Sequence, residues 1–527
     1  ASSIAARALG GARASAAEFE AAVSLVERTG TAALRAAERQ PKEVLDGVLQ
    51  PSLEFLQQVT APAATFHCTL EVKRLEFLSH WSPFYRHFGE DVLGQVLQRL
   101  LAVVESPPAD KDGISLQRRA LDTLVSLGRH GVLRPQQLEA LNTEFQRIAP
   151  KLTPNSQGKL TEALSAAIAA CGELQPARRA ELVSGIMEQP TARWLAAELV
   201  QQGGSGALQA AVAAAAAAAA QGAAAGQDAS VEQILRPLKD AWVLAGIFVG
   251  VVTKTSPDRG QDTKTTTPSE NPFGTSDGHP AAKVVRAWAP GVFALGSALA
   301  SLGPTGSPGE ALAAALGPLS DNEHISVTGR KPEERESAPS PSVPLDAPGL
   351  VAVRNIVWDL RCMFAKAMHA CLMCEEVWTL PQTTGWIRSL AEALPSMRPH
   401  TAELLLKEVF HPLIRVDLNP TTSPDRMPES LREAFCREVL PPLISAITKC
   451  IRAYWSRDVC DTLRMPSVFE EALATAVVSF SRSAALLLGA LAGTSAPGGI
   501  ARAATPALCD PERRLFRGLA GEAAPQQ

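Results

Sequence analysis

The stretch LEFLSHWSPFYRHFGEDVLGQVLQRLLAVV (Leu75–Val104) decides the fold. Its first part continues a helical apolar pattern that ends at Trp81, because Ser82-Pro83 follows and proline cannot continue a helix. Asp91 is a suitable first-turn residue for a second helix. Apolar residues then recur three or four positions apart, at Val92, Val96, Leu97, Leu100, Leu101 and Val104. The stretch therefore predicts helix, turn and helix.

The same arrangement is repeated along the next hundred residues. The spacing predicts further helices at Ser115–His130, Arg134–Pro150, Pro154–Gly172 and Pro176–Gln189. Two amphipathic helices and a short turn recur over about 40–45 residues, the period of HEAT-like repeats. One such pair cannot bury its apolar face alone, so neighbouring pairs must stack. Period-2 runs typical of strands are absent. We therefore predict an all-α fold, a HEAT-like helical-repeat solenoid (α-α superhelix) of the armadillo type.

Composition narrows the class of protein. The chain has 527 residues, of which 46% are hydrophobic and 20% charged, so most of it can bury a core. A net charge of −4 argues against a generally basic nucleic-acid binder and leaves a local basic strip possible. The nine cysteines are scattered through helical patterns, which favours buried thiols in a reducing compartment over a disulfide framework.

Low-complexity segments divide the chain. The predicted organisation is HEAT-like repeats at 1–202, an Ala/Gly-rich insertion at 203–230, repeats at 231–321 with a disordered loop at 254–280, a disordered linker at 322–348, C-terminal HEAT-like repeats at 349–495, and a mostly disordered tail at 496–527. Polyalanine in the first insertion favours helix but offers little surface for packing. The apolar run AWVLAGIFVGVV (Ala241–Val252) is too short to span a bilayer, so no membrane insertion is expected.

No pattern in the chain predicts catalysis. Cys371-Leu372-Met373-Cys374 is a CxxC without a second ligand pair, and His369 is the one other candidate ligand nearby. Because the pair lies late in an apolar helix, we interpret it as buried thiols. Walker A, HExxH, GxSxG and dinucleotide-binding signatures are missing. We therefore predict no enzyme activity, no catalytic, cofactor-binding or metal site, and no cofactor.

Arginines on successive second helices are the candidate binding residues: Arg99, Arg147, Arg178 and Arg179. In a two-helix solenoid these helices are expected to line the concave side. The simpler interpretation is a solvated helix face. The functional one is a dispersed strip that binds an acidic or RNA cargo through phosphates. Trp81 and Tyr85, by contrast, are predicted to anchor the core at the helix turn.

The order of segments resembles a known family. The residues concerned are EFLSHWSPFYRHFGEDVLGQVLQRLLAVVE (Glu76–Glu105), LQRRALDTLVSLGRHGVLRPQQLEALNTEFQRI (Leu116–Ile148), LTEALSAAIAACGELQPARRAELVSGIMEQPTARWL (Leu160–Leu195), NPFGTSDGHPAAKVVRAWAPGVFALGSAL (Asn271–Leu299), LLLKEVFHPLI (Leu404–Ile414) and EVLPPLISAITKCIRAYWSRD (Glu438–Asp458). They are similar to exportins of the exportin-five and HASTY type, karyopherins of the importin-β superfamily. The resemblance covers about two thirds of the chain, outside the insertions.

The resemblance implies a function and partners. Such receptors carry double-stranded RNA precursors, tRNA or proteins from nucleus to cytoplasm with Ran-GTP, and they meet nuclear pore proteins while shuttling. This chain would correspond to the central and C-terminal part of a longer receptor whose N-terminal region binds Ran-GTP. Two alternatives stay open: another importin-β-type transport receptor, and a non-transport HEAT-repeat scaffold of a phosphatase or RNA-processing complex.

Overall fold

A computed structural model gives the structure of the chain. It describes residues 16–40, 42–60, 68–88, 90–106, 111–202, 205–225, 229–255, 279–302, 348–411, 435–454 and 468–493, and isolated positions between 312 and 325 and at 413. Within these residues every regular element is helical, which confirms the all-α prediction. The predicted loop at 254–280, the linker at 322–348 and the tail at 496–527 fall largely outside the described residues. At their edges Thr255, His279 and Glu323 are buried.

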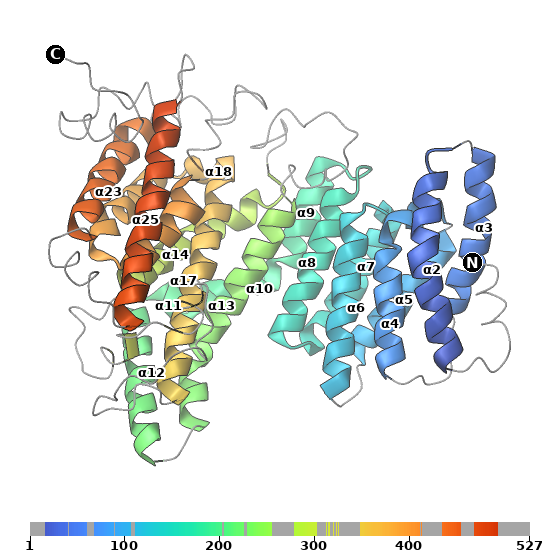
Figure 1. Cartoon of the computed structure of the whole chain (residues 1–527), viewed down its shortest axis with the longest axis horizontal. Helices are drawn as coiled ribbons and strands as arrows, with labels where there is room; N and C mark the ends of the chain where they lie inside the picture. The colour runs from blue at the N-terminus through green and yellow to red at the C-terminus, as the bar shows by residue number, and fades with distance from the viewer. Residues whose placement is uncertain are drawn as a thin grey trace. The chain divides into compact units, whose positions relative to one another are not determined.

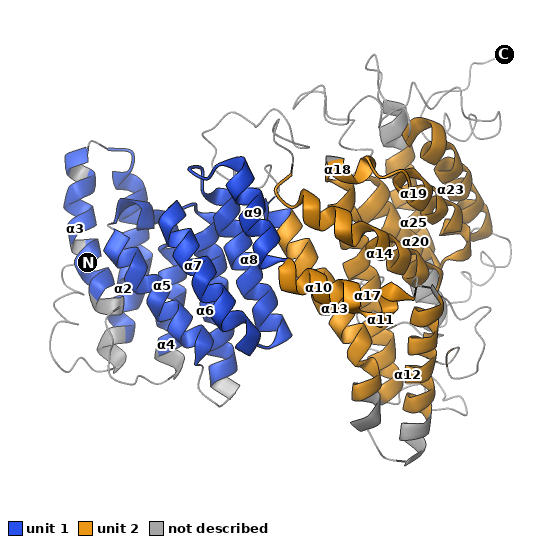
Figure 2. Ribbon diagram, turned by 180° about the vertical axis from the view of Figure 1, so that it is seen from behind, with its two compact units in different colours: residues 1–187, 253–262 blue, residues 188–252, 263–527 orange. Residues whose placement is uncertain are grey.

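The chain divides into two compact units, which Figure 2 colours separately. Unit 1 comprises residues 1–187 and 253–262, and unit 2 comprises residues 188–252 and 263–527.

Unit 1 has two layers of helices (Figure 1). The first layer contains α2 (Ala16–Ala37), α4 (Cys68–His80), α6 (Lys111–Arg129) and α8 (Pro154–Ala170), each packed on the next. The second contains α3 (Lys42–Thr60), α5 (Glu90–Glu105), α7 (Pro135–Ile148) and α9 (Pro176–Ile186). Short 3₁₀ turns follow two of these helices, η1 (Ser82–His87) after α4 and η2 (Ala149–Lys151) after α7. Pairs of helices in two layers are what a helical-repeat array requires.

The quoted stretch forms α4, η1 and α5, and an aromatic cluster fixes the turn. Trp81 is fully buried, and its ring lies 5.1 Å from that of Phe77 and 6.1 Å from those of Phe84 and Phe88. Tyr85 is buried as well, and its hydroxyl donates a hydrogen bond to the carbonyl of Leu78. The prediction that Trp81 and Tyr85 anchor the core is confirmed.

Helices α6 and α8 pack so closely that the backbone of α8 lies against Gly128 of α6. A Cβ on Gly128 would lie 2.6 Å from the carbonyl oxygen of Ala163 and 2.9 Å from the amide nitrogen of Ala167. Gly131, just past the end of α6, has a φ of +62°, a conformation that glycine adopts without steric cost. The close contact between α6 and α8 therefore depends on small residues in both helices.

Unit 2 contains α10 (Glu188–Ala196), α11 (Glu198–Gln201), α12 (Ser205–Ala225), most of α13 (Ala229–Thr255), α14 (Ala282–Ser301), α17 (Pro348–Leu372), α18 (Glu375–Trp378), α19 (Thr383–Ala393), η5 (Leu394–Ser396), α20 (Pro399–Leu405), α23 (Leu440–Tyr454) and α25 (Val468–Gly493). Two π-helical turns, η6 (Leu406–Phe410) and η7 (Phe435–Val439), extend α20 and precede α23. At its core Trp194 and Trp288 stack with ring centroids 4.6 Å apart, and Phe248 stacks on Trp288 at 4.9 Å. The indole N–H of Trp288 donates to the hydroxyl of Thr191.

The polyalanine stretch packs better than the sequence predicts. It forms α12, which lies against α14 and α17 and buries Leu208, Val212, Ala215, Ala216 and Ala219. The expectation that it offers little packing surface is wrong, because these residues are buried and the helix packs on two neighbours.

Helix α14 is long and strongly apolar. Among the described residues it is the helix that is long and apolar enough to cross a membrane by those two criteria. Of its apolar window, 67% is buried inside the protein, and one or two such helices are weak evidence for a membrane span.

His279 lies just before α14 and is buried without a charge partner strong enough to keep it protonated. Burial lowers its pKa from 6.5 to about 4, and nearby Glu376 offsets this only in part. Its Nδ1 accepts a hydrogen bond from the amide of Ala281, and its own amide donates to Glu376 Oε1 at 3.0 Å. His279 therefore contributes to the folded state as the neutral imidazole.

We expect Trp81→Ala to lower the free energy of unfolding of unit 1 by about 3–5 kcal/mol, because the residue fills the aromatic cluster. Trp81→Phe should cost less, since within the described residues no acceptor meets the indole Nε1. Chemical denaturation of the two variants measures both effects. Equal stability of wild type and Trp81→Ala would contradict the packing role.

Gly128→Ala should destabilise by about 1–3 kcal/mol, because its methyl group would push α6 away from the α8 backbone. The matched control is Gly185→Ala in α9, where an added Cβ meets nothing within 4 Å. There the helix-propensity gain of about 1 kcal/mol should raise the melting temperature. A fall of the same size in both variants would show that the close approach is not the cause.

Acid should destabilise unit 2 through His279. Below pH 6.5 the unfolded chain takes up a proton, whereas the folded state stays neutral until about pH 4. Stability is therefore lost as the pH falls across this window, by up to about 3 kcal/mol. In His279→Asn the amide oxygen can replace Nδ1 as acceptor without titrating. Denaturation of both proteins from pH 7 to pH 4 should give a steeper loss for wild type; parallel curves would contradict the assignment.

Candidate interaction groove

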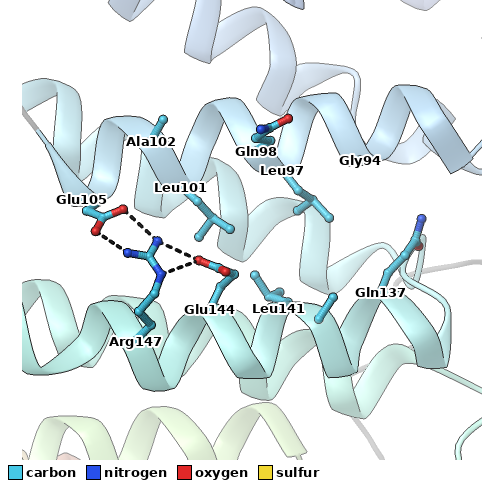
Figure 3. A pocket seen from close by; sticks show the side chains of 11 residues that line it. Gly94, Leu97, Gln98, Leu101, Ala102, Glu105, Gln137, Leu141, Glu144 and Arg147 are labelled. Atoms are coloured by element: carbon cyan, nitrogen blue, oxygen red, sulfur yellow. Dashed lines mark hydrogen bonds and ion pairs between the residues drawn. The ribbon is translucent and has the colours of Figure 1, made fainter.

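A groove runs along unit 1 between α5 and α7, with a volume of about 500 Å³ (Figure 3). Its floor is apolar, and its lining residues are Gly94, Leu97, Gln98, Leu101, Ala102, Glu105, Gln137, Ala140, Leu141, Glu144 and Arg147. Leu97 and Leu141 are buried and Leu101 is half-buried, so aliphatic side chains of both helices are partly accessible from the groove. A volume of this size lies in the range of ligand-binding sites.

Ion pairs join α5 and α7 at both ends of the groove. Arg134, immediately before α7, pairs with Glu90 at the start of α5, and Arg147 near the end of α7 pairs with Glu105 at the end of α5. One ion pair thus joins the N-terminal ends of the two helices, and the other joins their C-terminal ends. The two helices therefore run in parallel, with the groove between the two ion pairs.

The pair at the C-terminal end belongs to a cluster of four charges. Arg147 Nη2 lies 2.8 Å from Glu105 Oε2 and 2.7 Å from Glu144 Oε2, and Lys151 Nζ lies 2.8 Å from Glu105 Oε1. Hydrogen bonds from Arg147 and Lys151 lower the pKa of Glu105 to about 2. The bonds to Glu105 and Glu144 raise the pKa of Arg147. The cluster thus joins two basic side chains to two carboxylates, equal numbers of each sign.

The other predicted arginines lie on the same layer. Arg99 is on α5 and contacts Glu71 of α4 at 2.9 Å, with 24% of its side chain exposed. Arg178 on α9 lies 3.0 Å from Glu139 and 2.7 Å from Glu181. Arg179 donates to the carbonyl oxygen of Cys171. The structure thus places all four on α5, α7 and α9, but each already contacts an acceptor of the protein.

The carboxylates that meet these arginines were not predicted from the sequence. Across unit 1 an acid of one repeat commonly faces a base of the next. Such pairs are Glu38–Arg86, Glu76–Arg119, Glu90–Arg134, Glu105–Arg147, Asp122–Lys159 and Glu139–Arg178. Hydrogen-bonded partners in this set are 39 to 48 residues apart, close to one repeat. Opposite charges recurring at that distance are the signal that could have identified them.

Other candidate residues have structural roles. Cys371 and Cys374 are buried free thiols whose pKa values are raised by burial, which confirms their interpretation as core residues. Within the part of the chain that the structure describes, no group of three or more His, Cys, Asp or Glu side chains has a geometry that could hold a metal ion.

Comparison with known proteins identifies no family for this chain. The chain matches no protein-family model and no curated protein.

Proposed function

We propose that the chain is part of a nuclear export receptor that carries RNA or protein cargo with Ran-GTP. The observation that supports this most is the second layer of unit 1, where successive helices α5, α7 and α9 carry Arg99, Arg147, Arg178 and Arg179. The resemblance of the quoted sequence segments to exportins implies that transport runs from nucleus to cytoplasm and that Ran-GTP is the partner. Binding, rather than chemistry, is the activity of such an array.

An RNA cargo would bind mainly through its phosphates. A-form RNA hides its base edges in a deep, narrow groove, so arginines would contact the backbone. Arg147 and Arg178 are 48% and 47% exposed, but each is held between two carboxylates. A phosphate must therefore compete with Glu105 and Glu144 at one site and with Glu139 and Glu181 at the other. Such competition makes the affinity modest, and the phosphate contacts make it salt-dependent.

The two alternatives predict different responses to Ran-GTP. An exportin captures cargo in its presence, whereas an importin-type receptor releases cargo. A non-transport HEAT scaffold is indifferent to it. Pull-down of the full-length protein with Ran locked in the GTP form, with and without hairpin RNA, separates the three. Joint capture of Ran-GTP and cargo is the expected result.

We expect Arg147→Ala/Arg178→Ala to reduce the dependence of log affinity on log salt concentration by about two units, one for each lost phosphate contact. This pair tests the strip best, because both side chains are exposed and surface substitutions usually change stability by about 0.5 kcal/mol or less. Fluorescence anisotropy of a labelled RNA hairpin, titrated from low to high salt, measures the slope.

The matched control is Arg118→Ala/Arg129→Ala on α6, which removes the same charge from the first layer. It should leave the slope close to that of wild type. Glu139→Gln should strengthen RNA binding, because it removes one competitor for Arg178. Identical slopes for the two double variants would exclude the strip, and no RNA binding by wild type would favour a protein cargo.

A further inference from the structure

The walls of the α5–α7 groove have the residue spacing of a helix-packing seam. On α5 the lining positions are 94, 97, 98, 101, 102 and 105, and on α7 they are 137, 140, 141, 144 and 147. Steps of three and four residues keep each set on one face of its helix. Such a stripe is where a partner helix inserts its side chains as knobs into holes.

Small residues make holes in both stripes. Gly94 and Ala102 on α5 and Ala140 on α7 are exposed, and they alternate with Leu97, Leu101 and Leu141. A Cβ on Gly94 would meet nothing within 4 Å, so the space above it is open. Figure 3 shows Gly94 and Gln137 toward one end of the groove and the Glu105–Arg147–Glu144 cluster at the other. Along each helix the groove surface therefore alternates between small and large side chains every three or four residues.

A helix fits this groove better than an extended segment does. A strand binds by adding backbone hydrogen bonds to a sheet edge. Both walls here are α-helices, whose central backbone groups are already bonded within each helix. The groove therefore offers side-chain contacts alone, and these favour an occupant that carries its apolar residues on one face.

The direction of the walls favours one orientation of the occupant. α5 and α7 end together at the charge cluster, where two carboxylates and two cations cancel. What remains there is the partial negative charge of two helix C-termini. The positive N-terminal end of a third helix complements it, so the third helix should run antiparallel to both. From Gly94 to Glu105 the groove is about 16 Å long, or three helical turns.

We propose that the α5–α7 groove binds a three-turn amphipathic helix of a partner protein, antiparallel to both walls and with aliphatic side chains over Gly94, Ala102 and Ala140. The groove proposal rests on the proposed function in one respect, since in both the chain acts by binding other molecules. The groove contacts apolar side chains, whereas an RNA cargo would contact arginines. A helix of this length is marginal by itself, so the partner segment folds when it binds.

The test uses the full chain and a phage-displayed library of random 14-residue peptides. Selected peptides should carry aliphatic residues at i, i+3 or i+4, and i+7, and should gain helical circular dichroism on binding. Gly94→Leu places a bulky side chain in the groove, starting from a Cβ that meets nothing within 4 Å. It should weaken the binding of the selected peptides at least about tenfold. Gly47→Leu is the control: it makes the same change on α3, where an added Cβ also meets nothing. It should leave affinity within about twofold.

Both variants replace a helical glycine, so neither is expected to unfold the protein. A photo-crosslinker on the peptide N-terminus should label the Glu144–Arg147 region; labelling near Gly94 would overturn the orientation. Peptides without helical spacing, no enrichment, or equal binding to Gly94→Leu would overturn the site. Hairpin RNA affinity, measured on the same variants, separates the two proposals: it should not change with Gly94→Leu, whatever the fate of the export function.

Discussion

Unit 1 depends on one constraint: a pair of amphipathic helices can bury its apolar face only against the next pair. In the first layer α6 and α8 make this contact at short range, with the backbone of α8 lying against Gly128 of α6. In the second layer α5 and α7 are joined by ion pairs at their ends and leave a groove between. The same repeat therefore provides a solid core on one side and an accessible surface on the other.

The ion pairs between repeats give that surface its electrostatic character. Because an acid of one repeat meets a base of the next, cations of the second layer have carboxylate neighbours before any ligand arrives. Exposed pairs of this kind contribute little to stability. Their larger effect would be on the proposed RNA binding, since a polyanion would gain only the difference between its own attraction and that of the carboxylates it displaces. Weak and reversible binding is what the proposed function requires, because a transport receptor must also release its cargo.

Much of the fold could be predicted from the sequence, and less of the candidate site. Apolar spacing located α5 through Val92, Val96 and Leu100, and Ser82-Pro83 located the turn. The arginines were placed on the correct helices. Their partners were missed because a pair such as Arg178 and Glu139 is formed across a whole repeat and not within one helix. Packing of the polyalanine helix α12 was missed because propensity says nothing about how closely neighbours approach.

Two glycines in neighbouring helices are constrained for different reasons. Gly128 has no room for a methyl group, so any drift at this position is opposed by the fold itself. At Gly94 an added Cβ would meet nothing within 4 Å, and replacing the glycine with alanine would favour the helix. Selection for stability alone would therefore erode the second glycine and preserve the first. In descendants of this sequence, a small residue that persists at position 94 would indicate selection for binding a partner, because core packing does not require one there.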